Sequence, residues 1–274
     1  MLHQRIVADT LPRGASFGRI GPLEVRLAAG PADVAEAQAL RYTIFYRELG
    51  AIPLPSDGPA GLDIDHYDAV CDHLLVIDHD AGGRIVGTYR LLRQDIAAAH
   101  GGFYSAAEFD LSPLIASARG NGQVLELGRS CVAPAYRTTT TISLLWRGIA
   151  AYLQAHCISY MFGCASFQGT DPAVHAPALS LLYRQHLAPA GLRVRALPDH
   201  FIAMSRLDEG SFDQLSALRS LPPLLKGYLR VGAKVGDGAC IDRQFNTVDV
   251  FVVMPVAAIT RRYLDHYLGD RVAA

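Results

Sequence analysis

Apolar residues recur along the chain in two spacings, one typical of strands and one typical of helices. Short apolar runs predict strands at residues 23–27, 74–77, 85–92, 124–132, 160–167, 201–205, 239–241 and 250–254. Apolar residues three or four positions apart predict helices at residues 31–49, 142–156, 178–187, 224–231 and 257–267. Because helices alternate with strands and one strand pair reads as a hairpin, we expect an α/β protein with a mixed central sheet.

The pattern divides the chain into three parts. Residues 1–22 are rich in Gly and Arg and are expected to be loosely ordered. Residues 23–207 contain most of the predicted elements and suit one large α/β domain. Residues 208–274 begin with a predicted linker, 208–221, and read as an α/β extension packed on the same domain.

Two charged residues interrupt the apolar run 124–132, which should be a buried strand. Glu126 and Arg129 would lie on opposite faces of a regular strand, unless a β-bulge redirects one of them. Burying either charge is costly without a partner. Asp65, Asp68 and Arg90 lie upstream and could supply partners. The set is either the floor of an active site or a structural network of ion pairs, since both perturb pKa values.

Composition narrows the class of protein. The net charge of −1 gives no basic field for a nucleic acid. The five cysteines are scattered without a C-x-x-C pair, which favours a reducing, cytoplasmic compartment. No apolar stretch reaches the roughly 20 residues of a membrane span, so we expect a soluble protein or one bound peripherally to a membrane.

An ordered set of short motifs resembles two related enzyme families. Arg41-x-x-x-Phe45 and three further segments resemble the acyl-homoserine-lactone synthases, which are GNAT-like N-acyltransferases. The three segments are residues 65–68, 87–92 and 126–129. The chain resembles more closely the bacterial L-ornithine N-acyltransferases of ornithine-lipid synthesis, some of which are labelled hemolysin-like. The segments that carry this resemblance are residues 72–76, 103–110, 126–132, 144–148 and 221–230. The second resemblance covers residues 23–268, and the chain beyond residue 208 favours it because the lactone synthases are shorter.

The resemblance implies a GNAT-like three-layer fold around a mixed sheet, with an α/β extension at the C-terminal end. It also implies transfer of a 3-hydroxyacyl group from acyl carrier protein to the α-amine of L-ornithine. The 4'-phosphopantetheine belongs to the donor, and no bound cofactor, metal or acyl-enzyme is expected. Alternatives are a homoserine-lactone synthase, another amino-acid N-acyltransferase, or a non-catalytic, membrane-associated lipid-binding protein.

The charged residues have expected roles in this reaction. Glu126 would be the general base that takes a proton from the α-ammonium through a water, with Arg129 as its catalytic partner. Asp65 and Asp68 would raise the pKa of Glu126 by repulsion, Arg129 would lower it, and the two aspartates could hold the side-chain ammonium of ornithine. Arg90 or Arg129 would clamp the carboxylate of ornithine.

Two further substrate contacts are expected on the helix 31–49. Arg41 and Phe45 are four positions apart and share a face of that helix. Arg41 would make either a surface ion pair or a substrate contact, and Phe45 would pack in the core or meet the substrate. Backbone N–H groups of residues 128–132 are candidate oxyanion donors.

The expected binding site for the donor arm departs from the pattern of coenzyme A enzymes. Such GNAT enzymes place a glycine-rich turn before a helix, where N–H groups bind pyrophosphate. Here the matching stretch 137–142 keeps an arginine and has threonines in place of the glycines. Residues assigned to the phosphopantetheine arm are Val132, Arg137, Thr138, Thr139 and Thr140. The hydroxyls suit a single phosphodiester, or they only cap the helix.

Basic side chains gather on the last two predicted helices, at Lys226, Arg230, Arg261 and Arg262. They either form a solvated face or dock the acidic carrier protein or anionic lipid.

Overall fold

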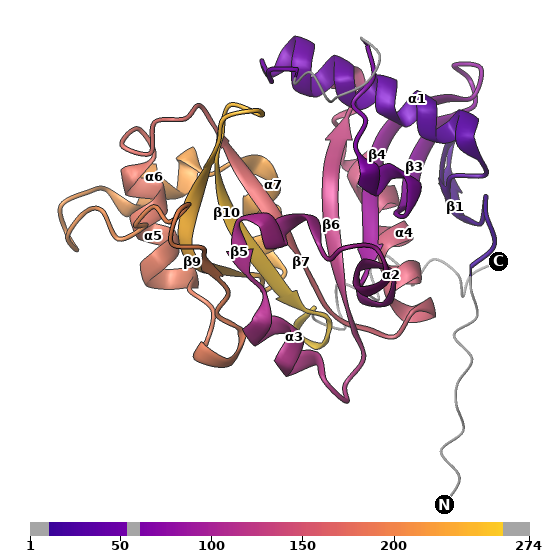
Figure 1. Cartoon of the computed structure of the whole chain (residues 1–274). Coiled ribbons are helices and arrows are strands. Elements are labelled where there is room, and N and C mark those ends of the chain that lie inside the picture. Colours follow the sequence, from indigo (N-terminus) through magenta and orange to yellow (C-terminus); the bar gives the residue numbers. More distant parts are fainter. Residues whose placement is uncertain (1–10, 54–60, 260–274) are drawn as a thin grey trace, which may run out of the picture.

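The computed structural model describes residues 11–53 and 61–259, and ten strands are found in that part of the chain. They are β1 (Ser16–Ile20), β2 (Leu23–Leu27), β3 (Asp72–Asp78), β4 (Arg84–Arg93), β5 (Phe109–Asp110), β6 (Gln123–Val132), β7 (Ile158–Gln168), β8 (Arg195–Ala196), β9 (Lys234–Asp242) and β10 (Thr247–Pro255). The sheet order is β1-β2-β3-β4-β6-β7-β10-β9-β8-β5 (Figure 1). Only β6–β7 and β8–β9 pair in parallel among these described strands, so the expected mixed sheet is confirmed.

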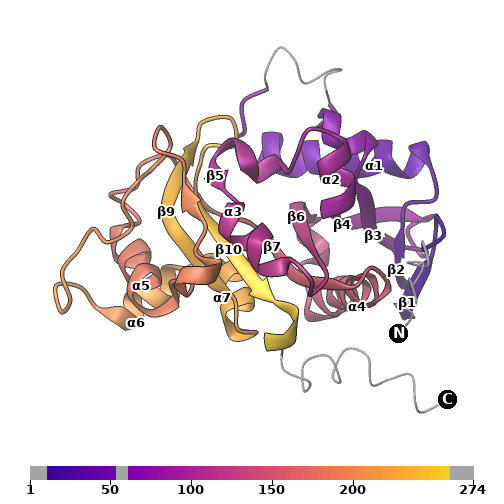
Figure 2. The ribbon, with the colours of Figure 1, turned by 60° about the horizontal axis from the view of Figure 1, so that its bottom comes forward.

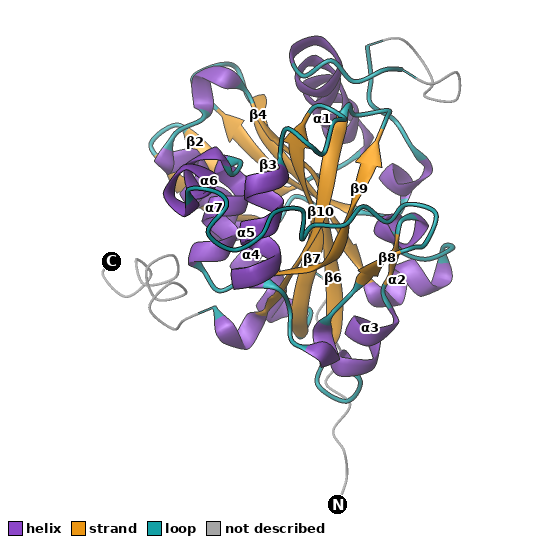
Figure 3. Ribbon diagram, turned by 90° about the vertical axis from the view of Figure 1, so that its left-hand side faces the viewer, coloured by secondary structure: helices purple, strands orange, loops and turns teal. Residues whose placement is uncertain are grey.

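Helices cover both faces of this sheet. The α-helices are α1 (Pro31–Tyr42), α2 (Gln94–Ala99), α3 (Ser112–Ala118), α4 (Thr139–Ala155), α5 (Ala176–His186), α6 (Gln214–Ser220) and α7 (Pro223–Arg230). The single-turn helices are η1 (Thr43–Glu48, a π-helix) and the 3-10 helices η2 (His66–Ala69), η3 (Tyr104–Ala107), η4 (Pro134–Tyr136), η5 (Ala190–Leu192) and η6 (Val256–Ala258). Figure 2 shows α1 and α2 on one side of the sheet and α4 to α7 on the other. Figure 3 shows α3 on the side of α2.

The core consists of two apolar clusters. The larger one contains the buried face of α4, including Leu145, Ile149 and Tyr152, at the spacing that predicted this helix. The smaller one lies under η3 and α3 and includes Phe162 and Phe251. Strand β10 contributes alternate residues to both clusters because it is covered on both faces, which explains its uninterrupted apolar run.

Strands β6 and β7 separate part-way along their length. Their parallel pairing runs from Gln123 and Ile158 to Glu126 and Phe162. Beyond that point β7 stays paired with β10 as far as Gln168, and Figure 1 shows β6 diverging from it. A Cβ atom at Gly163 would collide with the carbonyl oxygen of Leu127, so glycine permits the last close approach. The sheet therefore opens beside the strand that carries Glu126.

A β-bulge in β6 places Glu126 and Arg129 on the same side of the sheet. Arg90 pairs with Gly128 and Thr88 with Cys131, so β6 has one residue more than β4 across this interval. Arg129 has φ +48°, a left-handed conformation that is uncommon for a residue with a side chain. Regular alternation would have put the two charges on opposite faces, and the bulge redirects Arg129.

Several elements differ from the sequence-based expectation near the N-terminus and in the middle of the chain. Residues 16–20, within the segment expected to be loosely ordered, form β1 and bury Phe17. The helix expected at 31–49 changes to a π-helix after Tyr42. The strand expected at 201–205 is reduced to one bridge between Ile202 and Ala239.

The C-terminal part also differs. The expected linker 208–221 contains α6. Strands β9 and β10 lie in the main sheet beside β7, because β10 pairs with β7 over nine residue positions. The helix expected at 257–267 falls mostly outside the described residues, as do Arg261 and Arg262. Within residues 11–53 and 61–259, no helix is long and apolar enough to cross a membrane.

Candidate active site

A cavity of about 600 Å³ occupies the opening between β6 and β7. Its walls include residues 126–130 of β6 and residues 164–168 of β7. Five consecutive residues of a strand point to both faces of a sheet, so the cavity extends through the sheet. Tyr104 and Ser105 line it on the side of Glu126, and Pro222, Leu224 and Tyr228 line it near α7. The sheet opening is therefore a chamber lined by η3 towards one face of the sheet and by α7 towards the other.

Glu126 is held in this cavity by the first residues of η3. Its carboxylate accepts hydrogen bonds from the backbone N–H groups of Tyr104 and Ser105, each at 2.8 Å, and from the Ser105 hydroxyl. Only 4% of the residue is exposed. Burial raises the pKa of Glu126 above its ordinary value, while the hydrogen bonds from Ser105 and Tyr104 act in the opposite direction. The carboxyl group is fixed in place and is more basic than an exposed glutamate.

This geometry corrects the expected electrostatics of Glu126. We expected repulsion from Asp65 and Asp68 to raise its pKa, and Arg129 to lower it. Burial is the largest cause of the upward shift, and Arg90 is the arginine among the main causes that lower the pKa of Glu126. The aspartates are engaged elsewhere, as described next.

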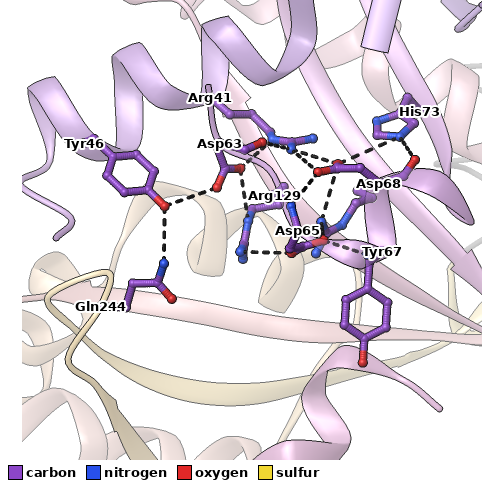
Figure 4. A network of polar contacts seen from close by, with 10 residues as sticks. Arg41, Tyr46, Asp63, Asp65, Tyr67, Asp68, His73, Arg129 and Gln244 are labelled. Carbon is purple, nitrogen blue, oxygen red and sulfur yellow. Dashed lines mark hydrogen bonds and ion pairs between the residues drawn. The ribbon is translucent and has the colours of Figure 1, made fainter. Parts of the chain in front are cut away.

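Arg41 is the centre of a buried ion-pair network (Figure 4). Its Nε lies 2.6 Å from Oδ2 of Asp63, and its Nη2 lies 2.8 Å from Oδ1 of Asp68. Arg41 has no exposed surface and Asp63 has 2%. Burial opposes ionisation of Asp68, but the charges of Arg41 and Arg90 outweigh it, so the pKa of Asp68 lies below its usual value. The sequence left a surface ion pair or a substrate contact open for Arg41, and the structure shows a buried ion pair.

Arg129 and Arg90 extend the network to the cavity wall. Arg129 contacts Asp63 at 3.2 Å through Nε and Asp65 at 3.3 Å through Nη2. Arg90 contacts Asp65 at 2.6 Å. The guanidinium carbon of Arg129 lies 5.0 Å from the ring centre of Tyr104 and 4.4 Å from that of Phe245. Ion pairs on one side and aromatic rings on the other hold Arg129 in the bulge.

The loop that carries the aspartates is itself ordered by hydrogen bonds. Asp65 caps η2 by accepting from the Tyr67 N–H at 2.8 Å, and its own N–H donates to Asp68 at 3.0 Å. His73 contacts the backbone oxygen of Asp68 at 3.0 Å, and burial lowers the pKa of His73. This histidine therefore supports the loop as a neutral side chain. Tyr46 joins the network at 3.4 Å from Asp63, and Gln244 donates to Tyr46 (Figure 4).

The structure divides the expected substrate contacts into two groups. Phe45 and Arg90 line the cavity, as do Glu126 and Arg129. Arg41 and Asp68 do not line it, because both are enclosed by the network. Asp65 does not line the cavity either, and its carboxylate pairs with Arg90 and Arg129.

The residues expected at the donor arm lie together at the start of α4, outside the cavity lining. Thr138 is the N-cap of α4 and accepts from the Thr141 N–H at 3.3 Å. Arg137 pairs with Glu48 at 2.7 Å and donates from Nε to the backbone oxygen of Val132 at 3.1 Å. Thr139 is exposed and Thr140 half-buried. Thr138 therefore caps the helix, as one of the two expectations held. Thr139 and Thr140 lie in the first turn of α4.

Sequence reasoning missed several residues of this site. Asp63 binds both Arg41 and Arg129, and Tyr104 and Ser105 bind Glu126. Asp249 lines the cavity from the apolar strand β10. An acid inside an apolar run was the signal that singled out Glu126, and the same signal would have found Asp249. Nothing local to η3 marks Tyr104 or Ser105 as partners of Glu126.

Within the described part of the chain, no three Asp, Glu, His or Cys side chains are placed to hold a metal ion.

Comparisons with known proteins agree with this architecture. Residues 40–147 match the acetyltransferase (GNAT) domain family, which confirms the expected GNAT fold. The chain is 47% identical over 267 residues to the L-ornithine N(alpha)-acyltransferase of Rhizobium meliloti (strain 1021), which covers 96% of this chain and 90% of that protein. It is 48% identical over 255 residues to the protein of the same name from Brucella abortus (strain 2308), covering 92% and 90%. The solved acyl-homoserine-lactone synthase BjaI is 16% identical, with a TM-score of 0.47 over 87% of this chain and 82% of that one.

Proposed function

The chain belongs to the family of L-ornithine N(alpha)-acyltransferases, and from this premise we propose that it acylates the α-amine of L-ornithine with a 3-hydroxyacyl group from acyl carrier protein. The amine nitrogen forms an amide bond with the acyl carbon as the carbon–sulfur bond of the thioester breaks. The products are a lyso-ornithine lipid and the free thiol of the carrier protein's 4'-phosphopantetheine.

Glu126 is the general base in this reaction. Ornithine reaches the enzyme with a protonated α-amine, which must lose a proton before nitrogen can attack the thioester. The three hydrogen bonds to Glu126 leave one of its roughly four acceptor positions for a water or for the amine. Its raised pKa makes it a stronger proton acceptor than an exposed glutamate. The nitrogen loses two protons in becoming an amide: one passes by way of Glu126 to the thiolate that leaves, and the other is released to solvent.

The opening between the strands supplies a place for the thioester. Beyond Glu126, the backbone groups of β6 that would bond to β7 have no strand partner and border the cavity. Of the expected donors, residues 128–132, residues 128–130 line the cavity, and an N–H group among them stabilises the oxyanion that develops when the amine attacks. The chamber fixes the thioester beside the amine, and such positioning can supply up to about 7–11 kcal/mol of the barrier.

The buried network positions the acceptor. Arg90 and Arg129 line the cavity, and one of them binds the carboxylate of ornithine. Asp63 and Asp65 fix the orientation of Arg129, and Arg41 fixes Asp63. Phe45 contributes an apolar wall.

The donor arm enters past the N-terminus of α4. Thr139 and Thr140 present hydroxyls there, and Arg137 adds a positive charge beside the Val132 carbonyl. These groups suit the single phosphodiester of phosphopantetheine, and the enzyme binds no cofactor of its own. We place the protein in the cytoplasm, where its basic residues Lys226 and Arg230 also permit a peripheral contact with anionic lipid at the inner membrane.

The observation that carries this proposal is the fixed, buried Glu126 at the opening of the sheet. The test is mass spectrometry of reactions containing purified protein, 3-hydroxyacyl carrier protein and L-ornithine, with lysine, glutamine and S-adenosylmethionine as parallel acceptors. We expect N-(3-hydroxyacyl)ornithine from the wild type and from the control Glu209→Gln, whose glutamate is exposed. Glu126→Gln should make almost none, and Arg129→Ala should lose most activity.

Two outcomes would contradict the proposal. A product from S-adenosylmethionine in place of ornithine would indicate a homoserine-lactone synthase. No amide with any acceptor, from folded protein and loaded carrier, would favour a lipid-binding protein.

A further inference from the structure

Resting on the proposed function, we propose that Asp249, supported by Asp242 and Glu108, binds the side-chain ammonium of the acceptor amino acid. This end of the cavity, formed by β9 and β10, would then select an amino acid that carries a second cationic amine. The acid group is separate from the aspartates of the η2 loop, to which the sequence first assigned this role.

Asp249 is a buried acid of the cavity lining, and one of its oxygens has no hydrogen-bond partner. It is 7% exposed, and its Oδ1 has no hydrogen-bond partner. Within residues 11–53 and 61–259, six buried side-chain nitrogen or oxygen atoms lack a partner. The two of these that line the cavity are Oδ1 of Asp249 and Oγ1 of Thr247, which lie two positions apart on β10. The side chains of Thr247 and Ser166 lower the pKa of Asp249 as hydrogen-bond donors do, and the acceptor left over, Oδ1 of Asp249, indicates a site for a further donor.

The charge around Asp249 is also unbalanced. Among the described residues, Asp249, Asp242 and Glu108 take part in no recorded ion pair, whereas Arg129, the arginine that acts on Asp249, is paired with Asp63 and Asp65. Burial, followed by the charges of Asp249 and Asp242, raises the pKa of Glu108 to about 7. Burial likewise raises the pKa of Asp249 to about 6, against the side chains of Thr247 and Ser166. A cation bound here would stabilise the carboxylates of Asp249 and Asp242, which line the cavity, and would act at longer range on Glu108, which does not line it.

The position of Asp249 suits the length of a diamino acid. Ser105, which binds Glu126, also lies 3.7 Å from the sulfur of Cys164. Asp249 pairs with Ser166, two residues further along β7, which is a distance of about 7 Å on a strand. The α-nitrogen and δ-nitrogen of ornithine are about 6 Å apart when the chain is extended. An ornithine with its α-amine near Glu126 can therefore reach Asp249 with its side-chain ammonium.

The η2 aspartates are poorly suited to this role. Asp63, Asp65 and Asp68 are matched by Arg41, Arg90 and Arg129, so the network has three negative and three positive charges. A cation binding to Asp65 or Asp68 would have to displace an arginine. At Asp249 it would meet free acceptor atoms.

The test compares ornithine with norvaline, which has the same carbon chain and lacks the side-chain amine. We would measure kcat/KM for both at saturating 3-hydroxyacyl carrier protein, with wild type, Asp249→Asn and the control Asp237→Asn. Asp237 is on β9 and pairs with the exposed Arg195. Asp249→Asn should lower kcat/KM for ornithine by about 30-fold or more and leave that for norvaline within about threefold of wild type. Asp237→Asn should match the wild type with both substrates.

Either of two results would contradict the proposed ammonium-binding site at Asp249. One is an Asp249→Asn enzyme with the wild-type ratio of ornithine to norvaline. The other is an equal loss with both substrates, which would show a structural role. Glu108→Gln serves as a second variant and should shift the same ratio by a smaller factor, while thermal unfolding checks that each variant is folded. A wild type that acylates neither amine would instead reject the proposed function, and the subsite with it.

Discussion

Two groups of buried charge border the same cavity, and they differ in how the charge is compensated. On the η2 side, three arginines and three aspartates pair with one another at 2.6–3.5 Å. On the other side, Glu126 and Asp249 make no ion pair with any described residue, and burial raises the pKa of each. The first group is neutral as a set, and the second carries unbalanced negative charge.

This difference indicates a division of labour. A compensated network has no net charge with which to attract a further ion, so its main value lies in holding side chains, including the arginine that meets the carboxylate of ornithine, in one geometry. An uncompensated buried acid costs stability, so its retention is best explained by an interaction with substrate or by proton transfer. The compensated group should therefore govern folding and positioning, and the uncompensated acids should govern chemistry and specificity.

The largest expected effect comes from removing the charge of Glu126. Glu126→Gln should lower kcat by roughly 10²–10⁴-fold, because general-base catalysis is lost, while the fold is retained. The wild-type rate should also fall as the pH drops through the pKa of Glu126, which lies above the ordinary value of 4.5. Steady-state kinetics across pH measure both effects. A variant with the wild-type kcat would remove Glu126 from the chemistry.

Removing an arginine from the ion-pair network on the η2 side should mainly lower the stability of the fold. Arg41→Met leaves buried Asp63 and Asp68 with only their longer contacts to Arg129 and Arg90, at 3.2 and 3.5 Å, and should lower the free energy of unfolding by about 3–5 kcal/mol. Urea denaturation measures the loss, and Asp68→Asn in the same chain should recover part of it. The control Arg195→Ala, in a pair whose arginine is 63% exposed, should cost no more than about 1 kcal/mol. Equal losses of unfolding free energy for Arg41→Met and Arg195→Ala would contradict the expected difference between a buried and an exposed ion pair.

Removing the uncompensated charge of Asp249 should stabilise the protein in a pH-dependent way. The pKa of Asp249 is about 6 in the folded state and 3.8 when unperturbed. The folded state thus holds the proton more tightly, so wild-type stability falls as pH rises from about 4 through about 6. Asp249→Asn should avoid this loss. The difference in free energy of unfolding between the variant and the wild type should therefore increase in favour of the variant by about 2–3 kcal/mol from pH 4 to pH 7.5. Urea unfolding at both pH values checks this, and a difference independent of pH would contradict it.

The smallest effects concern the start of α4. The sequence left two roles for the threonines there, helix capping and phosphate binding. Thr138→Ala should lower the free energy of unfolding by about 1 kcal/mol because it removes the cap. Thr139→Ala and Thr140→Ala should leave stability unchanged and raise KM for acyl carrier protein a few-fold. Unfolding curves and donor titrations separate the two contributions. An unchanged KM in both variants would leave capping as the function of these threonines.

Much of the fold could be predicted from local pattern. The strands 74–77, 85–92, 124–132, 160–167 and 250–254 all lie within observed strands, because a buried strand needs an apolar run that can be recognised locally. The single-turn helices and the conversion of α1 to a π-helix were not predictable, since such short elements depend on tertiary contacts. Strand β1 was missed because glycine and arginine obscured its alternation.

By itself, the sequence determined that charges must be buried at residues 126 and 129, that partners lay upstream, and which family the chain resembles. Only the tertiary structure decided that a bulge puts Arg129 on the same side of the sheet as Glu126, and that Arg41 is buried inside the network. It also decided that β10 carries Asp249 to the far wall of the cavity. The physical reason is that desolvation cost can be read from one strand, whereas the choice of partner depends on strand order and register between segments far apart in the chain.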